Sequence, residues 1–291
     1  MMKQIKVIML MTVACLAGCS SDDTEQTQKR ETPRPMIVDV LEIPDADDPS
    51  SPPMAKSRTA AVTTTSTLSS FSMNYMENNE YKLTKKNNVW STNQWPMVNS
   101  DQKLDFYAHT SGTFNYNNGN PYVAFSVEET VTNQHDLLVA EHKQISYNDA
   151  SGHVSLSFDH ACAAVYFTVQ MTNTLNNLLG GNLSVTSIIL RNVCNIGDYD
   201  YPSKSWKNIT GSAYYTLNNS PIDVTTTAKP LSCGYLFMIP QKRAKNGITG
   251  THLEINYTKG KDKTAIIPLD IDWEAGKLHT INIKLGTSTI Q

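Results

Sequence analysis

The stretch VSLSFDHACAAVYFTV, residues 154–169, decides the fold class of this chain. Apolar residues stand at every second position from Val154 to Phe158, with polar residues between them, and the alternation returns from Val165 to Val169. Successive side chains of a β-strand point to opposite faces of its sheet. Each half of the stretch therefore predicts a strand that buries one face.

Segments of the same kind fill most of the chain around this stretch. Short strand-like runs are separated by turn residues about every 8 to 12 positions, which is typical of β-sandwiches rather than of parallel α/β sheets. The last run alternates as well, at Ile281, Ile283 and Leu285. Only residues 172–179 favour a short helix, closed by two glycines. We therefore predict an all-β fold.

Length and composition indicate two folded domains and no nucleic-acid partner. The chain has 291 residues, of which 40% are hydrophobic and 18% charged, and its formal net charge is −3. This length fits two domains of about 100 to 200 residues each. The hydrophobic content excludes a disordered chain, and the slightly negative net charge excludes a basic, nucleic-acid-binding one. We place an N-terminal domain at residues 36–170 and a C-terminal domain at residues 171–291.

The amino terminus predicts export. Two lysines precede an uncharged apolar run, residues 7–17, which is too short to span a bilayer. The run ends in LAGC, residues 16–19, which resembles the bacterial lipobox. The resemblance implies removal of residues 1–18 and attachment of lipid to Cys19. A plain signal peptide with an incidental cysteine is the alternative.

A polar segment follows the lipobox and predicts a tether, residues 19–35. Its first residues, SSDD at 20–23, resemble the acidic export signal of surface lipoproteins in Bacteroidetes. That resemblance implies the outer face of the outer membrane, with the lipid as anchor. Ordinary solvated tether residues are the alternative for the two aspartates.

The run MIVDVLEI, residues 36–43, predicts a first strand that is apolar on both faces. Six buried apolar side chains would contribute on the order of 10 kcal/mol as an upper estimate. Residues 44–53 contain four prolines, so an exposed connection follows and leads to Lys56 and Arg58. Cutting that connection would let the strand leave, exposing an apolar groove that favours a strand from a neighbouring molecule.

No pattern in the sequence predicts an enzyme, a metal site or a cofactor. The chain lacks the serine-hydrolase, zinc-protease and phosphate-loop motifs. Asp159 and His160 stand near Cys162, but adjacent strand residues point to opposite faces and cannot act together. Three histidines could supply metal ligands, although their spacing matches no zinc template: His135, His142 and His153.

Three cysteines remain in the chain after residue 19. We expect Cys162, Cys194 and Cys233 to be small buried hydrophobic residues. A disulfide between Cys194 and Cys233 is the alternative, because export places the chain outside the cytoplasm.

Several short motifs, taken in order, resemble the fimbrillin-like proteins of Bacteroidales, which are subunits of type V pili. The likeness covers nearly the whole exported chain. Its motifs are FSMNY (71–75), WP (95–96) with LDFYA (104–108), DLLVA (136–140), VxLxFxHA (154–161), IILRN (188–192) with Gly197, IPQ (239–241) and WEAGK (273–277).

The resemblance implies two transthyretin-like β-sandwich domains with Greek-key connections, lipoprotein export, and removal of the first strand by an Arg- or Lys-specific protease. It also implies polymerisation by strand exchange, and no catalytic residue carries over. Arg58 is the best match to the processing position, with Lys56, Arg30 and Arg34 as alternatives. The candidate donor strand alternates near a free terminus and contains Ile281, Ile283 and Leu285.

We therefore expect a surface-lipoprotein precursor of a structural or adhesive subunit of a cell-surface fimbria. Its expected partners are other fimbrial subunits, the outer membrane through the lipid, and a ligand on a host or bacterial surface. Stalk, tip and anchor roles stay open. The alternative is a glycan-binding lipoprotein of a polysaccharide-uptake system, motivated by aromatic residues such as Trp90, Trp206 and Tyr199. An extracellular hydrolase lacks a readable acid, base and nucleophile.

Overall fold

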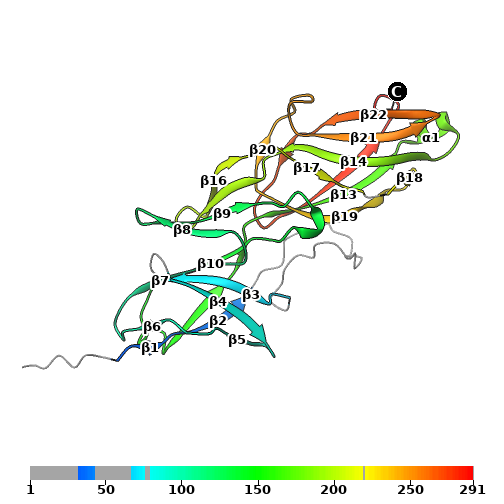
Figure 1. Cartoon of the computed structure of the whole chain (residues 1–291). Coiled ribbons are helices and arrows are strands. Elements are labelled where there is room, and N and C mark those ends of the chain that lie inside the picture. Colours follow the sequence, from blue (N-terminus) through cyan, green and yellow to red (C-terminus); the bar gives the residue numbers. More distant parts are fainter. Residues whose placement is uncertain (1–31, 43–66, 76–78, 219, 291) are drawn as a thin grey trace, which may run out of the picture. The chain divides into compact units, whose positions relative to one another are not determined.

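The computed structural model describes residues 32–42, 67–75, 79–218 and 220–290. The chain falls into two units, residues 1–32 and 33–291, and every described element lies in the second. Among the described residues these elements are strands, apart from one α-helix and one short 3₁₀ helix (Figure 1). The predicted fold class, an all-β chain of two β-sandwiches, is confirmed.

Ten strands surround the first of two hydrophobic cores. Six form an antiparallel sheet in the order β12-β10-β7-β3-β4-β5, and the others form the pairs β11-β2 and β1-β6. Their bounds are β1 Arg34–Pro35, β2 Ile37–Glu42, β3 Ser70–Tyr75, β4 Asn79–Lys86, β5 Val89–Ser91, β6 Met97–Val98, β7 Leu104–His109, β10 Leu138–Ile145, β11 His153–Ser157 and β12 Asp159–His160.

The remaining elements surround the second core. Their sheets have the orders β19-β13-β24, β17-β14-β21-β22 with β18 beside β14, β16-β15-β9-β8, and β20-β23. Their bounds are β8 Thr113–Asn117, β9 Asn120–Ser126, η1 Val131–Asn133, β13 Ala163–Met171, α1 Asn173–Leu179, β14 Leu183–Val193, β15 Ile196–Asp200, β16 Ser205–Thr210, β17 Ala213–Thr216, β18 Ile222–Val224, β19 Lys229–Met238, β20 Lys242–Arg243, β21 His252–Lys259, β22 Lys261–Pro268, β23 Ile271–Asp272 and β24 Leu278–Leu285.

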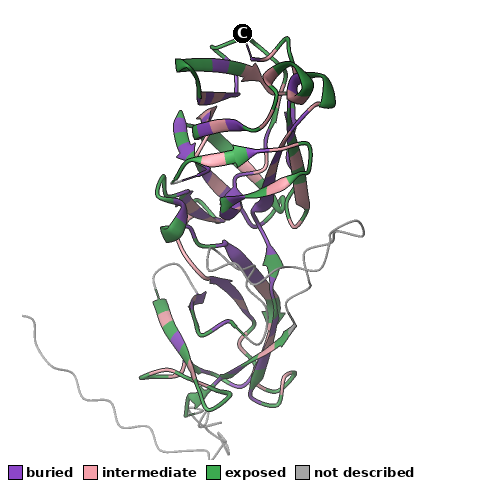
Figure 2. Ribbon diagram, turned by 90° about the vertical axis from the view of Figure 1, so that its right-hand side faces the viewer, coloured by how far each residue is buried: buried purple, intermediate pink, exposed green. Residues whose placement is uncertain are grey.

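Buried apolar side chains form two clusters, which we call the smaller core and the larger core. Figure 2 marks the buried residues in purple along the ribbon. The smaller core includes Met36, Val38, Phe71, Phe106 and Phe158. The larger core includes Val123, Phe125, Phe167, Leu190 and Tyr215. The hairpin of β8 and β9 pairs with β15, so a segment from the first half of the chain packs into the larger core. The boundary near residue 170 stays a prediction.

The stretch at residues 154–169 passes from one core to the other. The apolar residues of its first half are fully buried in the smaller core: Val154, Leu156 and Phe158. Those of its second half are fully buried in the larger core: Val165, Phe167 and Val169. Both predicted strands are confirmed, because the intervening side chains are half-buried or exposed.

The single predicted helix is confirmed as α1. Thr172 precedes it with an extended backbone, and its hydroxyl accepts a hydrogen bond from the backbone N–H of Leu175 at 3.2 Å. Gly180 ends the helix with φ of 68°, a conformation that glycine adopts without strain. The helix therefore has capping groups at both ends.

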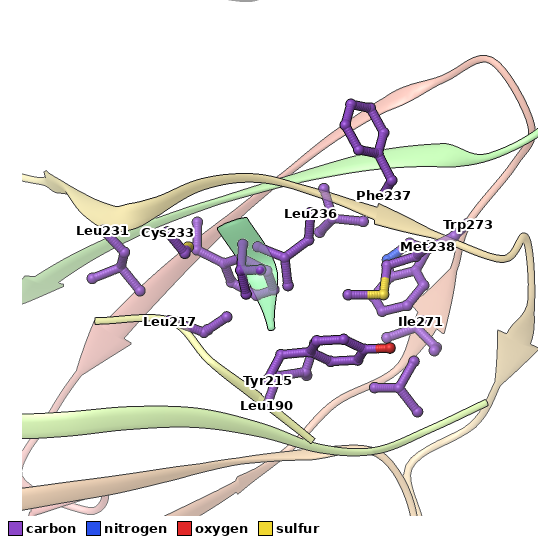
Figure 3. Close-up of a cluster of buried hydrophobic side chains, with 14 of the residues drawn as sticks. Leu190, Tyr215, Leu217, Leu231, Cys233, Leu236, Phe237, Met238, Ile271 and Trp273 are labelled. Atoms are coloured by element: carbon purple, nitrogen blue, oxygen red, sulfur yellow. The ribbon is translucent and has the colours of Figure 1, made fainter. Parts of the chain in front are cut away.

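One buried hydroxyl in the larger core has no partner. Figure 3 shows Tyr215 among apolar side chains that include Leu190, Met238 and Ile271. Its hydroxyl is buried and has no hydrogen-bond partner among the described residues. Burial raises the pKa of Tyr215 well above its usual value, and the charge of Glu129 adds to the shift.

Tyr215→Phe should therefore stabilise the protein by about 1 kcal/mol, since it removes a polar group whose desolvation is not compensated. Urea denaturation followed by circular dichroism measures this change. Tyr201→Phe is the matched control, because the Tyr201 hydroxyl is buried but donates to the Ala108 carbonyl at 2.7 Å. The free energy of unfolding of that variant should fall by about 1 kcal/mol. Equal losses in the two variants would contradict the conclusion that the Tyr215 hydroxyl has no partner.

Candidate assembly site

The first described strand of six residues, β2, has one neighbouring strand among the described residues. It pairs in parallel with β11, from Ile37 opposite His153 to Glu42 opposite Ser157. Two backbone hydrogen bonds fix its start: the Met36 N–H donates to the Pro96 carbonyl and the Ile37 N–H to the Gly152 carbonyl, both at 2.8 Å. Among the described residues, β2 is therefore an edge strand, with a neighbouring strand on one side only.

Side chains of β2 alternate between the smaller core and solvent. Met36 is 0% exposed, Val38 is 1% exposed, and Val40 is half-buried against the same core. Ile37 and Leu41 are 37% and 61% exposed. The predicted strand is apolar on both faces, but only one face is buried: β2 covers one side of the smaller core, and no described residue covers its outer face.

This alternation halves the energy expected from burial. The inward side chains of β2 contribute on the order of 5 kcal/mol, as an upper estimate, in place of about 10. Ile43, the last residue of the predicted strand, lies outside the described residues. The slot beneath β2 is nevertheless apolar, since Val154 and Leu156 of β11 are fully buried beside it.

The residue pair before β2 adds weaker contacts. Arg34 and Pro35 form β1, which pairs with β6 at Val98 and Met97. The Arg34 guanidinium lies 5.4 Å from the ring centre of Tyr147. Such a contact at an exposed site contributes about 0.5 to 1 kcal/mol. Strand pairing and side-chain burial therefore hold β1 and β2 in place, and both are non-covalent.

Most basic processing candidates fall outside the described residues, as does the lipidation candidate. Lys56 and Arg58 lie in the connection between β2 and β3, and Arg30 and Cys19 precede the first described residue. Arg34 is described and exposed in β1. All of these assignments stay predictions.

The candidate donor strand is β24, which in this structure is part of its own larger core. It pairs in parallel with β13, from Leu278 opposite Ala164 to Leu285 opposite Met171. Ile283 is 3% and Leu285 0% exposed, and Ile281 packs against the same core. Sequence reasoning missed that Ile290, near the end of the chain, is also buried. Donation by this segment stays a prediction.

Two polar residues of the family-like motifs meet inside the protein. His160 Nδ1 is hydrogen-bonded to Asp136 Oδ2, and their side chains are only 4% and 1% exposed. Burial raises the pKa of Asp136, while the hydrogen bond and charge of His160 lower it. Sequence reasoning missed this pair because Asp136 lies 24 positions away. The neighbour Asp159 is exposed and does not orient the imidazole.

The thiol near this pair is not set up as a nucleophile. Cys162 is 2% exposed, and burial raises the pKa of its thiol well above the usual value, with the charge of Asp136 adding to the shift. A thiol that stays protonated is a poor nucleophile. Cys162, Cys194 and Cys233 are all free, so the alternative Cys194–Cys233 disulfide is not formed. Cys162 and Cys233 are buried as expected, but Cys194 is only half-buried.

The three metal-ligand candidates do not come together. His142 Nδ1 lies 2.9 Å from the Ser155 carbonyl oxygen, and His153 Nδ1 lies 2.8 Å from Asp39 Oδ2. The described residues contain no group of three acidic, histidine or cysteine side chains that could hold a metal ion. In the same part of the chain, no helix is long and apolar enough to cross a membrane.

The tryptophans proposed to stack on sugars have structural contacts. Trp90 packs edge-on against Phe71 of the smaller core, with ring centres 4.9 Å apart. The indole N–H of Trp206 donates to the Ala161 carbonyl at 2.7 Å. Both side chains are half-buried and pack against a core, which is the commoner role of a sandwich tryptophan.

Solved structures with the same fold come from Bacteroides. A fimbrial protein from Bacteroides vulgatus aligns with a TM-score of 0.58 and 16% identity, covering 89% of this chain and 97% of its own. A candidate cell adhesion protein from Bacteroides ovatus aligns at 0.55 and 12% identity, covering 89% and 95%. Another from Bacteroides uniformis aligns at 0.52 and 14%, covering 77% and 88%. At these identities the likeness shows the fold alone.

No curated protein matches the chain in sequence. The model of one protein family does: the family described as fimbrillin-like matches residues 52–291. That match spans most of the chain and starts after β2, so it contains both cores except for the first strands. The chain belongs to the fimbrillin-like family.

Proposed function

We propose that this chain is the precursor of a structural or adhesive subunit of a cell-surface fimbria, assembled with other subunits by strand exchange. Family membership supports the fimbrial or adhesive role. Lipid attachment at Cys19 after removal of residues 1–18 would hold the precursor at the outer membrane, facing outward.

One observation carries the assembly proposal: β2 fills an apolar slot in the smaller core but is joined to β3 through the segment that contains Lys56 and Arg58. After cleavage at either residue, only non-covalent contacts would retain β2. Its departure would uncover Val154 and Leu156 together with the unpaired backbone edge of β11. An apolar slot beside a free strand edge binds an alternating strand by β-addition.

The energies permit such an exchange. The inward residues of β2 contribute on the order of 5 kcal/mol, against a typical domain stability of about 5 to 15 kcal/mol. A strand from a second subunit would restore the same burial and pairing. Because donor and acceptor surfaces differ, the contact is heterologous, and repeated heterologous contacts that do not close form filaments.

Donation of the strand would cost the donor subunit some of its own pairing and burial. Donation of residues 280–290 from β24 would break its parallel pairing with β13 and expose Ile283 and Leu285. We propose that this segment is released only when it enters the slot of another subunit, where the burial it loses is replaced.

N-terminal sequencing of protein recovered from cell-surface filaments tests this function. We expect a chain that starts near Thr59, after cleavage at Arg58. Arg58→Ala should abolish that start and prevent filament formation, while Lys56→Ala serves as the matched control and should process normally. A lipid-blocked chain that still begins at Cys19 within filaments would contradict processing and strand exchange together.

A further inference from the structure

A surface hollow, distinct from β2 and its slot, is lined by residues of β10, β11, β12 and β15 and of the turn after β15. Its volume is about 180 Å³. Polar groups from several segments line it: Glu141, Ser157, Asp159, Tyr199, Tyr201 and Lys204. We call this site the tyrosine hollow.

Tyr199 is a largely buried residue in the lining of the hollow. The residue is 6% exposed, and its ring packs edge-on against Tyr201 and Trp206, with ring centres 5.6 and 5.9 Å away. No described residue forms a hydrogen bond with its hydroxyl. Burial raises the pKa of Tyr199 well above its usual value, and the charges of Asp159 and Glu141 add to the shift. The hydroxyl therefore stays protonated and available as a donor next to two carboxylates of the hollow.

The charges around the hollow nearly balance. Glu141 lies between two ammonium groups, 2.8 Å from Lys143 Nζ and 3.8 Å from Lys204 Nζ. Asp159 is exposed, and its carboxylate forms no ion pair with a described residue. Lys204 is the one basic residue in the lining, and Lys143, which lies outside it, pairs with Glu141, so the four charges together cancel. A neutral ligand is therefore favoured.

The mixture of donors and acceptors indicates which neutral ligand fits. Hydroxyl groups both donate and accept, so a polyhydroxylated ligand can donate to Asp159 and accept from Tyr199 or Lys204. The tyrosine ring faces are covered, which leaves hydrogen bonds rather than stacking to hold the ligand. Pockets for drug-sized ligands measure about 300 to 1,000 Å³, so this smaller one has room for a single ring.

We propose that the tyrosine hollow binds one sugar residue of a carbohydrate chain. The proposal rests on the proposed function, to which it adds a ligand class for adhesion. Binding would be weak at a single hollow, and many copies along a filament would raise the avidity.

Saturation-transfer NMR on the purified full chain tests the proposal. The probes are the methyl glycosides of galactose, mannose, glucose, fucose and N-acetylglucosamine at millimolar concentration. At least one should bind. Tyr199→Phe should weaken it roughly two- to tenfold, and Asp159→Asn roughly tenfold, because hydrogen bonds to charged groups are stronger. Tyr199→Phe should fold normally, since the ring contacts persist.

Tyr214→Phe is the matched control, because Tyr214 is 51% exposed and lies outside the hollow. This variant should bind the glycoside with unchanged affinity. No binding of any glycoside, or binding unaffected by Tyr199→Phe and Asp159→Asn, would overturn the proposal. So would binding of a lysine-containing peptide in place of the sugars. Filament formation tests strand exchange separately. Absence of glycoside binding in a protein that forms filaments rejects the tyrosine hollow alone. Glycoside binding by a protein that forms no filaments rejects the fimbrial proposal alone.

Discussion

Val38→Asp should lower the free energy of unfolding by about 4 kcal/mol or more, the largest loss we expect from one substitution in β2. Val38 is 1% exposed and packs in the smaller core, so the change places a carboxylate where it has neither water nor an opposite charge. Urea denaturation followed by circular dichroism measures the loss. A variant that does not fold at all agrees with the same expectation.

Leu41→Asp provides the control on the same strand. Leu41 is 61% exposed, so its replacement should change the free energy of unfolding by no more than about 0.5 kcal/mol. The pair of variants separates burial in the slot from any general effect of a new negative charge on β2. Similar losses at both positions would show that β2 does not present alternate faces to core and solvent.

The second large effect should come from the buried pair of Asp136 and His160. Asp136→Ala and His160→Ala should each cost about 3 to 5 kcal/mol, because each removes one member of a buried ion pair and leaves the other group without its opposite charge. The double variant should lose less than the sum of the single losses, since each single variant already removes the same interaction between the two groups. Thermal and urea unfolding of all four proteins complete this cycle.

An additive cycle would contradict the pairing of Asp136 with His160. Asp159→Ala is the matched control for sequence proximity, because Asp159 is adjacent to His160 in the chain but exposed. It should change the stability by no more than about 0.5 kcal/mol. A large loss of stability in Asp159→Ala would indicate that Asp159, rather than Asp136, orients the His160 imidazole.

Local patterns predicted the strands well because alternation reports directly on burial. Val154 to Phe158 and Val165 to Val169 are buried as their spacing indicates, and the short helix lies between Thr172 and Gly180 as expected. These features depend on side-chain period and on capping, both of which are local properties of the sequence.

Features that depend on distant partners were not predictable in this way. The hydrogen bond between Asp136 and His160 and the pairing of β9 with β15 join segments whose spacing carries no signal. For β2, the run indicated apolar residues on both faces, but only a three-dimensional arrangement tells which of those faces is covered. Ile37 and Leu41 are exposed for that reason. The tyrosine hollow likewise combines residues from four strands and a turn.

A trimming experiment tests most directly whether β2 is replaceable. The purified precursor is cut with trypsin, and its intact mass and its size by light scattering are measured at high protein concentration. We expect a trimmed chain that has lost residues 36–42 and forms oligomers, and an excess of a synthetic peptide of residues 36–43 should suppress them. A trimmed chain that keeps residues 36–42 bound and stays monomeric would contradict the account.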